Sequence, residues 1–324
     1  MPVERPKWSR KKLYQIGSSC HAEVQWTPWS RQLEVPAFSA GLQFGVSVFE
    51  GMQAHVSSAK GDYRIQFLDD HYARLTDSSA TVGIKIPTQP HFEAGVTGVV
   101  EDLLAARCDR EDWSSTRIYI RGLSFSGSED IFPRAHYPFL CNLFAVTVPL
   151  PQAPANLHLI SDPSFIRALP YSRIGAAKSA VNYTRIVELE RDQPNSPQQQ
   201  RLWLSPEQDR TVEELDTMGF GFVLDDGSLH TAPATASKLP SVTIKRLRAR
   251  LAEMGHPVAE TALPYEQLHR DLDNGRIVGL FGASTGKGLG IARQLTRAQQ
   301  HYDLDFPPDV EALLWQAYRS MMET

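Results

Sequence analysis

The stretch that decides the fold reads Gly175-Ala-Ala-Lys178-Ser-Ala-Val-Asn-Tyr183, and Glu214 follows 31 residues after its tyrosine. Small residues before Lys178 leave room around its backbone. From Tyr183 to Leu189 the apolar residues recur at helical spacing, which places the lysine and the phenol at a junction between a strand and a helix. A lysine in such a position is a candidate for covalent chemistry with a carbonyl group.

Pyridoxal 5'-phosphate is the cofactor that needs this combination of side chains. Its chemistry requires an amine for the aldehyde, a carboxylate for the pyridine nitrogen, a donor for the ring oxygen and a cradle for the phosphate. Lys178, Glu214 and Tyr183 supply the first three. Taken singly, a lysine is more often a solvated charge and a tyrosine a packing residue. The hypothesis therefore depends on a phosphate cradle elsewhere in the chain.

Two segments are candidates for that cradle. Thr243 opens an expected helix, whose free N–H groups and positive dipole end favour a phosphate, although a threonine there is more often a simple helix cap. The segment 281–288 is a turn of small residues that carries the hydroxyls of Ser284 and Thr285. Its spacing fails the nucleotide-binding Gly-x-x-x-x-Gly-Lys-Ser/Thr pattern at both ends. Arg74, on an early helix, could add a fixed positive charge.

The composition is that of an ordinary globular protein. The chain has 324 residues, 42% hydrophobic and 22% charged, and its formal net charge is −4. This charge gives no footprint for nucleic acid, so we expect no nucleic-acid partner. Since the basic amino terminus is not followed by an apolar run and no apolar stretch reaches about 18 residues, we expect a soluble, cytoplasmic protein without a membrane partner. Cys20, Cys108 and Cys141 are widely spaced, which predicts reduced thiols and no metal site.

Strands and helices are mixed without a regular βαβ rhythm, which predicts an α+β or mixed α/β fold of two domains. We expect a small N-terminal α/β domain at 1–155 with an irregular arm at 1–35, a proline-rich linker at 156–170 and a large cofactor-binding domain at 171–324. Periodicity predicts strands at 42–49, 63–67, 117–122, 139–148, 220–224 and 277–281, helices at 69–80, 96–104, 240–254 and 307–321, and a polar loop at 193–200.

Six segments, in order between about residue 40 and residue 293, resemble the motifs of branched-chain amino acid aminotransferases. They are Phe44-Gly-Val-Ser-Val-Phe49-Glu50-Gly51-Met52, His71-Tyr-Ala-Arg74-Leu75, Lys178-Ser-Ala-Val-Asn182-Tyr183, Glu214-Leu-Asp216-Thr217-Met218, Leu239-Pro-Ser-Val-Thr243 and Gly282-Ala-Ser-Thr285. This family belongs to the class IV, or fold-type IV, pyridoxal-phosphate aminotransferases. The resemblance implies the two-domain architecture of D-amino-acid aminotransferase and a homodimer.

The resemblance also implies roles for individual residues. Lys178 would form the Schiff base with the cofactor, Glu214 would meet the pyridine nitrogen and Tyr183 the ring hydroxyl. The residues expected around the phosphate are Arg74, Val242, Thr243, Ser284 and Thr285. The residues expected around the substrate are Phe44 and Phe49 at its side chain, Tyr119 and the Thr285–Gly286 turn at its carboxylate, Thr217 as a further contact, and Arg121 for an acidic substrate.

The chain also departs from the usual family pattern. Ala180 and Val181 stand where the family has two glycines, Asp216 stands for a glycine, Gly219 for an asparagine and Ser241 for a glycine. In the pocket, Phe44 replaces a tyrosine and Gln53 a basic residue. These changes spare the cofactor groups but alter their surroundings, and a rearranged pocket changes substrate preference. They favour a specialised biosynthetic enzyme over a housekeeping one.

The sequence therefore predicts a transaminase of amino-acid metabolism. It would move an amino group between a branched-chain or related hydrophobic amino acid and a 2-oxo acid, by a ping-pong mechanism through Lys178. A D-amino-acid aminotransferase or an aminodeoxychorismate-lyase-like enzyme of the same fold stays open. A nucleotide-binding protein and a non-catalytic homologue are the competing classes, and the retained set of cofactor residues argues against both.

Overall fold

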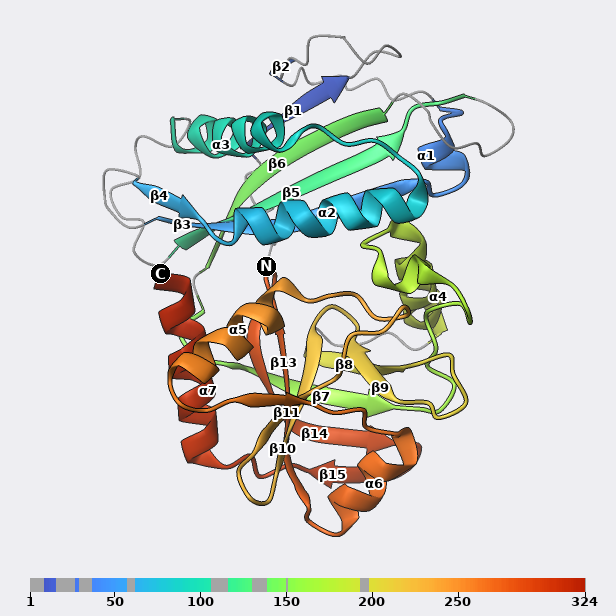
Figure 1. The fold of residues 1–324 in the computed structure, drawn as a ribbon, viewed down its shortest axis with the longest axis vertical. Helices are drawn as coiled ribbons and strands as arrows, with labels where there is room; N and C mark the ends of the chain where they lie inside the picture. The colour runs from blue at the N-terminus through green and yellow to red at the C-terminus, as the bar shows by residue number, and fades with distance from the viewer. Residues whose placement is uncertain are drawn as a thin grey trace, which may run out of the picture. The chain divides into compact units, whose positions relative to one another are not determined.

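The computed structural model describes residues 9–15, 27–28, 37–56, 62–105, 116–129, 139–149, 151–192 and 198–323. The chain divides into two compact units, coloured along the chain in Figure 1. The first contains Met1–Leu150 together with the short segment Ala177–Val181, and the second contains Pro151–Ala176 and Asn182–Thr324. Lys178 therefore belongs to the first unit, whereas Tyr183 and Glu214 belong to the second.

The first unit contains an antiparallel sheet. Its order among the described residues is β2-β1-β6-β5-β3-β4. The strands are β1 (Ser9–Gln15), β2 (Thr27–Pro28), β3 (Ser47–Val56), β4 (Tyr63–Ile65), β5 (Thr116–Ser126) and β6 (Phe139–Pro149). The arm expected to be irregular thus supplies β1, because the backbone groups of β6 need a partner on that side and β1 provides it antiparallel. Cys20 and the rest of the arm, with Cys108, lie outside the described residues.

Two helices complete the core of the first unit. They are α2 (Leu68–Val82), close to its predicted position, and α3 (Gln89–Ala105), which contains the predicted helix but begins seven residues before it. Their apolar residues pack with those of β3, β5 and β6; buried examples are Leu75, Phe92, Val96, Met52, Ile118 and Leu143. The strand expected from residue 42 begins only at Ser47, because the chain first forms the short helix α1 (Ala40–Gln43) and then turns at Gly45 with a φ of +66°.

The second unit contains a sheet that closes on itself. Its path among the described residues is β12-β11-β10-β13-β14-β7-β8-β9, β15 pairs with β14, and β9 also pairs with β10. The strands are β7 (Ala155–Ser161), β8 (Gln199–Leu204), β9 (Val212–Leu215), β10 (Gly219–Leu224), β11 (Leu229–Thr231), β12 (Val258–Glu260), β13 (Ile277–Ser284), β14 (Gly288–Arg297) and β15 (Gln300–Asp303). The closure brings β9, which carries Glu214, against both β8 and β10.

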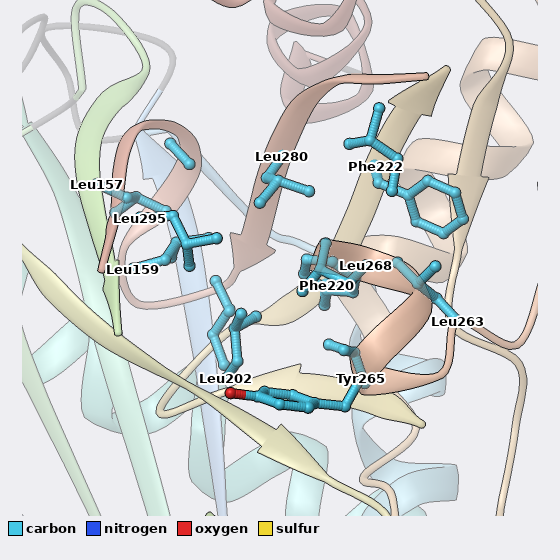
Figure 2. Packing of buried hydrophobic residues seen from close by; sticks show 14 of the residues in the cluster. Leu157, Leu159, Leu202, Phe220, Phe222, Leu263, Tyr265, Leu268, Leu280 and Leu295 are labelled. Atoms are coloured by element: carbon cyan, nitrogen blue, oxygen red, sulfur yellow. The ribbon is translucent and has the colours of Figure 1, made fainter. Parts of the chain in front are cut away.

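Part of the segment expected to be a linker belongs to this sheet. Residues 155–161 form β7, because Leu157 and Leu159 point into the core that Figure 2 shows. They meet Leu202, Phe220, Leu280 and Leu295 there. Of the polar loop expected at 193–200, residues 193–197 lie outside the described residues and Gln199 already begins β8.

The helices of the second unit are α4 (Thr184–Asp192), α5 (Val242–Glu253), α6 (Tyr265–Asp273) and α7 (Pro308–Glu323). The predictions for α5 and α7 are confirmed to within two residues at each end. The α6 helix packs Tyr265 and Leu268 into the core of Figure 2. Among the helices of the described residues, none is long and apolar enough to cross a membrane.

Candidate active site

Lys178 lies between two short 3-10 turns. The η1 turn (Arg173–Ala176) precedes it and η2 (Ala180–Tyr183) follows, so the strand expected before the lysine is wrong, whereas the helix after Tyr183 is confirmed as α4. The backbone before Lys178 packs on a neighbouring loop instead of a sheet. Ala176 N–H donates to the Ala236 carbonyl at 3.1 Å, and a Cβ on Gly175 would lie 2.2 Å from the Ser237 carbonyl oxygen. Glycine is required at position 175 for this close approach.

The Lys178 backbone is fixed from both sides within the first unit. Its N–H donates to Ser78 Oγ on α2 at 2.9 Å, and its carbonyl accepts from Phe49 N–H on β3 at 2.9 Å. The side chain is half-buried, and its Nζ lies 4.8 Å from the centroid of the Phe49 ring. A lysine held in this way can swing its amine while its attachment point stays in place.

Arg74 is held by a buried carboxylate. Glu50 on β3 is 0% exposed and accepts from Arg74 Nε and Nη2, both at 2.7 Å. His71, one turn before Arg74 on α2, donates from Nδ1 to the same carboxylate at 2.9 Å. Burial raises the pKa of Glu50, but the Arg74 charge and the hydrogen bonds from His71 and Arg74 outweigh it and hold that pKa at about 2. The guanidinium of Arg74 is therefore fixed in direction by a permanent partner.

Phe49 lies beside a second cation. The Arg121 guanidinium is 4.6 Å from the Phe49 ring centroid, and Arg121 Nε and Nη2 donate to the Tyr119 hydroxyl at 3.0 and 2.7 Å. A Cβ on Gly51 would lie 2.5 Å from that hydroxyl, so glycine is needed there for Tyr119 to stay. The structure thus brings together Phe49, Tyr119, Arg121 and Lys178, a combination of aromatic surface and positive charge that suits a small carboxylate with an apolar side chain.

The two departures expected in the substrate pocket, Phe44 and Gln53, lie in the first unit. Phe44 ends α1 and is 37% exposed. Gln53 is buried and accepts a hydrogen bond from Arg117, which is itself buried on β5. A basic group is therefore still present beside position 53, but it comes from the neighbouring strand.

In the second unit, Glu214 and Tyr183 lie around one arginine. Arg167 Nη2 donates to Glu214 Oε1, and the Arg167 guanidinium is 6.0 Å from the centroid of the Tyr183 ring. Glu214 is 7% exposed. Its neighbour Glu213 has different partners, since Glu213 Oε1 accepts from the hydroxyls of Thr235 and Ser237. Successive side chains of a strand point to opposite faces, so Glu213 and Glu214 lie on opposite faces of β9. Glu214, the carboxylate expected to face the cofactor, is the one that shares Arg167 with Tyr183.

The α5 amino terminus and the turn after β13 meet in this unit. Thr243 Oγ1 lies 3.3 Å from Thr285 Oγ1. Ser241 caps the helix by accepting from Ile244 N–H at 3.2 Å, whereas the N–H groups of Val242 and Thr243, in the first helical turn, have no acceptor within the helix itself. Ser284 Oγ instead accepts from Lys287 N–H at 3.1 Å, so this hydroxyl shapes the turn that carries Gly286.

Thr217 occupies the hairpin between β9 and β10. It is exposed, and both its N–H and its hydroxyl donate to Gln200 Oε1, at 3.3 and 3.1 Å. Leu215 N–H donates to the Met218 carbonyl at 2.8 Å and closes the turn. Thr217 therefore lies in the turn that follows β9, and Glu214 lies in β9 itself.

Sequence reasoning missed three charged residues of these clusters. Glu50 was quoted within a motif but given no role, although an acid in a strand of buried residues is a signal for a buried partner. Arg167 and Lys238 carry no local signal. Lys238 is 8% exposed and donates from Nζ to the carbonyls of Ala232 and Pro233. Burial lowers its pKa against the opposing charges of Glu214 and Glu213.

The residues present fit pyridoxal 5'-phosphate. The N–H groups at the α5 terminus, with the adjacent hydroxyls of Thr243 and Thr285, form a cradle for an oxyanion. A buried carboxylate, Glu214, and a phenol, Tyr183, lie beside one arginine in the same unit. In the first unit, the anchored Lys178 carries the amine that the aldehyde of the cofactor requires.

Comparison with known proteins agrees with this assignment. A family model described as amino-transferase class IV matches residues 47–294. The chain belongs to this family, whose members use pyridoxal phosphate, and it is a pyridoxal-phosphate-dependent transaminase with a fold of type IV.

Individual relatives are distant. The chain is 23% identical over 263 residues to a probable branched-chain-amino-acid aminotransferase of Staphylococcus aureus, covering 78% of this chain and 70% of the relative. The branched-chain aminotransferase of Thermoproteus uzoniensis, solved with norvaline, superposes with a TM-score of 0.74 at 17% identity, over 97% of this chain and 96% of that one. The branched-chain amino acid aminotransferase of Escherichia coli gives a TM-score of 0.74 at 20% identity, over 97% of this chain and 95% of that one.

Proposed function

We propose that this transaminase moves an amino group between a branched-chain or related hydrophobic L-amino acid and a 2-oxo acid. The observation that carries the proposal is the cluster of Phe49, Tyr119 and Arg121 beside Lys178. Aromatic rings suit an apolar side chain, while a guanidinium fixed by a phenol suits a carboxylate. The branched-chain relatives support the choice of side chain.

Lys178 is proposed as the catalytic residue. When bound, pyridoxal phosphate supplies the carbonyl that takes up the amino group and the ring that accepts electrons from the substrate carbon. The anchored backbone of Lys178 supports a role for its amine at the substrate Cα, where the amine would hold and return one proton. Because the product of the first half-reaction must leave before the second 2-oxo acid enters, the kinetics should be ping-pong.

The second unit supplies the groups proposed to hold the ring and the phosphate. Glu214 would meet the pyridine nitrogen and Tyr183 the ring oxygen, and Arg167 would keep both side chains in place. The phosphate would lie on the Val242 and Thr243 N–H groups and the hydroxyls of Thr243 and Thr285. Arg74 of the first unit, fixed by Glu50, would supply positive charge, and Ser284 would act through the shape of its turn.

The substrate contacts at the remaining positions are proposals of the same kind. Phe44 and Phe49 would line the side-chain pocket, and Thr217 and the Thr285–Gly286 turn would face the carboxylate. Arg121 would pair with the second carboxylate of an acidic substrate. Phe44 and Gln53, which replace a tyrosine and a basic residue of the family pattern, favour a specialised biosynthetic substrate.

We also propose that the two units are a small N-terminal α/β domain and a large cofactor-binding domain, and that the enzyme is a cytoplasmic homodimer. The compactness of each unit supports the first point. Exposed apolar side chains support the second, among them Phe38, which is 68% exposed, and Leu42, which is 63% exposed. Sedimentation of the purified enzyme tests the dimer.

The function is tested by the visible absorption of the enzyme loaded with pyridoxal phosphate. L-leucine, L-glutamate, D-leucine and L-phenylalanine are added separately, each followed by 2-oxoglutarate. Bleaching by L-leucine and recovery of the band with 2-oxoglutarate are expected. Bleaching by D-leucine alone would replace the proposal with a D-amino-acid aminotransferase, and the absence of any bleaching would overturn it.

A further inference from the structure

The hairpin that carries Thr217 has an unusual turn. Three residues, Asp216, Thr217 and Met218, lie between β9 and β10, and none of them has a positive φ. Hairpin loops of two or three residues usually place at least one residue at a positive φ, which matches the twist of the strands. This turn therefore depends on groups outside the hairpin to keep its shape.

Those groups come from β8, which lies beside β9 in the sheet (Figure 1). Asp216 Oδ1 accepts from Trp203 Nε1 at 2.8 Å, and Asp216 Oδ2 accepts from Arg201 N–H at 3.1 Å. Arg201 Nη1 lies 3.4 Å from the same oxygen. With the two hydrogen bonds from Thr217 to Gln200, Asp216 and Thr217 are both tied to one neighbouring strand.

The Asp216 carboxylate is costly to keep there. Asp216 is 6% exposed, and Arg201 and Trp203 are each 1% exposed. Burial raises the pKa of Asp216, while the hydrogen bonds from Arg201 and Trp203 and the Arg201 charge oppose that rise. A buried ion pair contributes little net stability compared with apolar packing, although removing one partner is damaging. The ion pair between Asp216 and Arg201 therefore matters chiefly for the shape that it gives this turn.

The same network also reaches α4. Arg201 Nη1 also donates to Glu190 Oε1 at 3.0 Å. Glu190 lies on α4, the helix that begins directly after Tyr183. One buried guanidinium therefore connects the helix that follows Tyr183 with the turn that follows Glu214.

We propose that Asp216 is a positioning residue that fixes the Thr217 turn for the substrate carboxylate, and that it thereby sets substrate affinity without taking part in proton transfer. The inference rests on the proposed function, which assigns Thr217 to the substrate. It also accounts for an aspartate at a position where the family pattern has glycine: the glycine would give the turn its freedom, whereas Asp216 fixes it through β8.

The test compares Asp216→Asn with two other variants. Asn keeps an acceptor for Trp203 but loses the charge that faces Arg201. Trp203→Phe keeps an aromatic ring and loses the donor, so it probes the same carboxylate while leaving its charge in place. Asp226→Asn is the matched control, since Asp226 also caps a hairpin turn of this unit by accepting from Ser228 N–H at 2.8 Å, between β10 and β11.

Binding of 4-methylvalerate, an apolar carboxylate that has no amino group to transfer, is measured by calorimetry on the enzyme loaded with pyridoxal phosphate. We expect Asp216→Asn to raise its Kd, and the KM for L-leucine, by about tenfold, the effect of about one lost hydrogen bond. The Trp203→Phe variant should show a smaller rise in the same direction. The kcat and the affinity for pyridoxal phosphate should stay within about twofold of wild type, and Asp226→Asn should change nothing.

Two results would overturn the inference while leaving the proposed function intact: an unchanged Kd in both variants, or a fall in kcat at constant Kd. A loss of melting temperature in Asp216→Asn with normal binding in Trp203→Phe would make the cluster merely structural and would also overturn it. If wild type neither binds 4-methylvalerate nor bleaches with any donor, the proposed function fails and this inference fails with it.

Discussion

Arg167 is the residue on which the arrangement of the second unit depends most directly. It contacts both Glu214 and Tyr183 and is itself 4% exposed at its side chain. Arg167→Met should remove the charge that holds Glu214 and let both side chains move, so the rate of the bleaching half-reaction with the donor should fall about 100-fold, as when a preorganised polar group is lost from an active site. Stopped-flow absorption measures this rate.

The control for that prediction is Arg293→Met. Arg293 pairs with Glu311 on the surface of the same unit, and exposed pairs contribute little. Its half-reaction should match wild type. If Arg167→Met also matched wild type, Arg167 would have no part in positioning Glu214.

In the first unit Glu50 holds Arg74 in place, as Arg167 holds Glu214 in the second. Glu50→Gln leaves Arg74 buried without its carboxylate, and breaking a buried pair of this kind costs about 3 kcal/mol of the free energy of unfolding. The freed Arg74 should also hold the phosphate less firmly, so the Kd for pyridoxal phosphate should rise. Chemical denaturation and cofactor titration measure the two effects. Glu101→Gln on the exposed face of α3 is the control, and a Glu50→Gln enzyme as stable as this control would contradict the argument.

At the level of elements, two departures from the family pattern compensate each other. Gly219, where the family has asparagine, begins β10, and Ser241, where the family has glycine, caps α5. A Cβ on Gly219 would lie 3.0 Å from Ser241 Cβ and 2.5 Å from Ile244 Cγ1. The absence of a side chain at 219 therefore makes room for the serine and lets α5 approach β10.

This packing predicts a coupling that a double-mutant cycle can measure. Gly219→Ala should cost about 1–3 kcal/mol of the free energy of unfolding, as overpacking of a core does. In a Ser241→Gly background the same change should cost about 1 kcal/mol less, because the contacts with the Ser241 side chain are gone while the contact with Ile244 stays. Urea denaturation of the four proteins gives the cycle. Additive effects of the two substitutions would show that the two positions are independent.

The elements that sequence could predict are those whose own residues carry the pattern. Helices α2, α5 and α7 and strands β6 and β13 are long and strongly periodic, and they lie close to their predicted positions. Strand β9 has only four residues and exists because β8 and β10 flank it. The same holds for β1, which depends on β6, and for η1, whose polar groups pair with a distant loop. Such elements follow from tertiary contacts that no local window contains.

Some residues of the candidate site could likewise be predicted from the sequence, whereas their partners could not. Lys178, Tyr183, Glu214 and Thr243 could be found from sequence because they stand in recognisable motifs. Their partners could not, since Arg167 is 47 residues from Glu214 and Glu50 is 24 residues from Arg74. The sequence named Asp216 as a departure, but its effect on the turn required the geometry of β8.

At the scale of the whole molecule, each unit contains a buried titratable group that makes its stability depend on pH. In the first unit the pKa of Glu50 is about 2, against an ordinary value of 4.5. In the second, the pKa of His269 is about 4 against an ordinary 6.5, chiefly because burial disfavours the charged ring, with the Arg297 charge acting in the same direction. His269 is 1% exposed, and its Nε2 lies 2.8 Å from Ser161 Oγ.

For both groups the free energy of unfolding falls as the pH falls, because a pKa lowered in the folded state means that the unfolded chain takes up its proton at a higher pH. Stability from His269 is complete above pH 6.5 and is lost as the pH falls toward 4, and stability from Glu50 is complete above pH 4.5 and is lost toward pH 2. Each contribution amounts to about 3 kcal/mol at most, from the size of the shift. The second unit should therefore lose stability as the pH falls below 6.5.

Hydrogen exchange followed by mass spectrometry can separate the two units, since peptides from α6 and β10 report on one and peptides from α2 and β3 on the other. Between pH 6.5 and 4.5 the opening free energy of the second unit should fall. His269→Gln should flatten this slope in the second unit alone, because glutamine cannot take up the proton. Equal slopes in wild type and His269→Gln would assign the acid sensitivity to other groups.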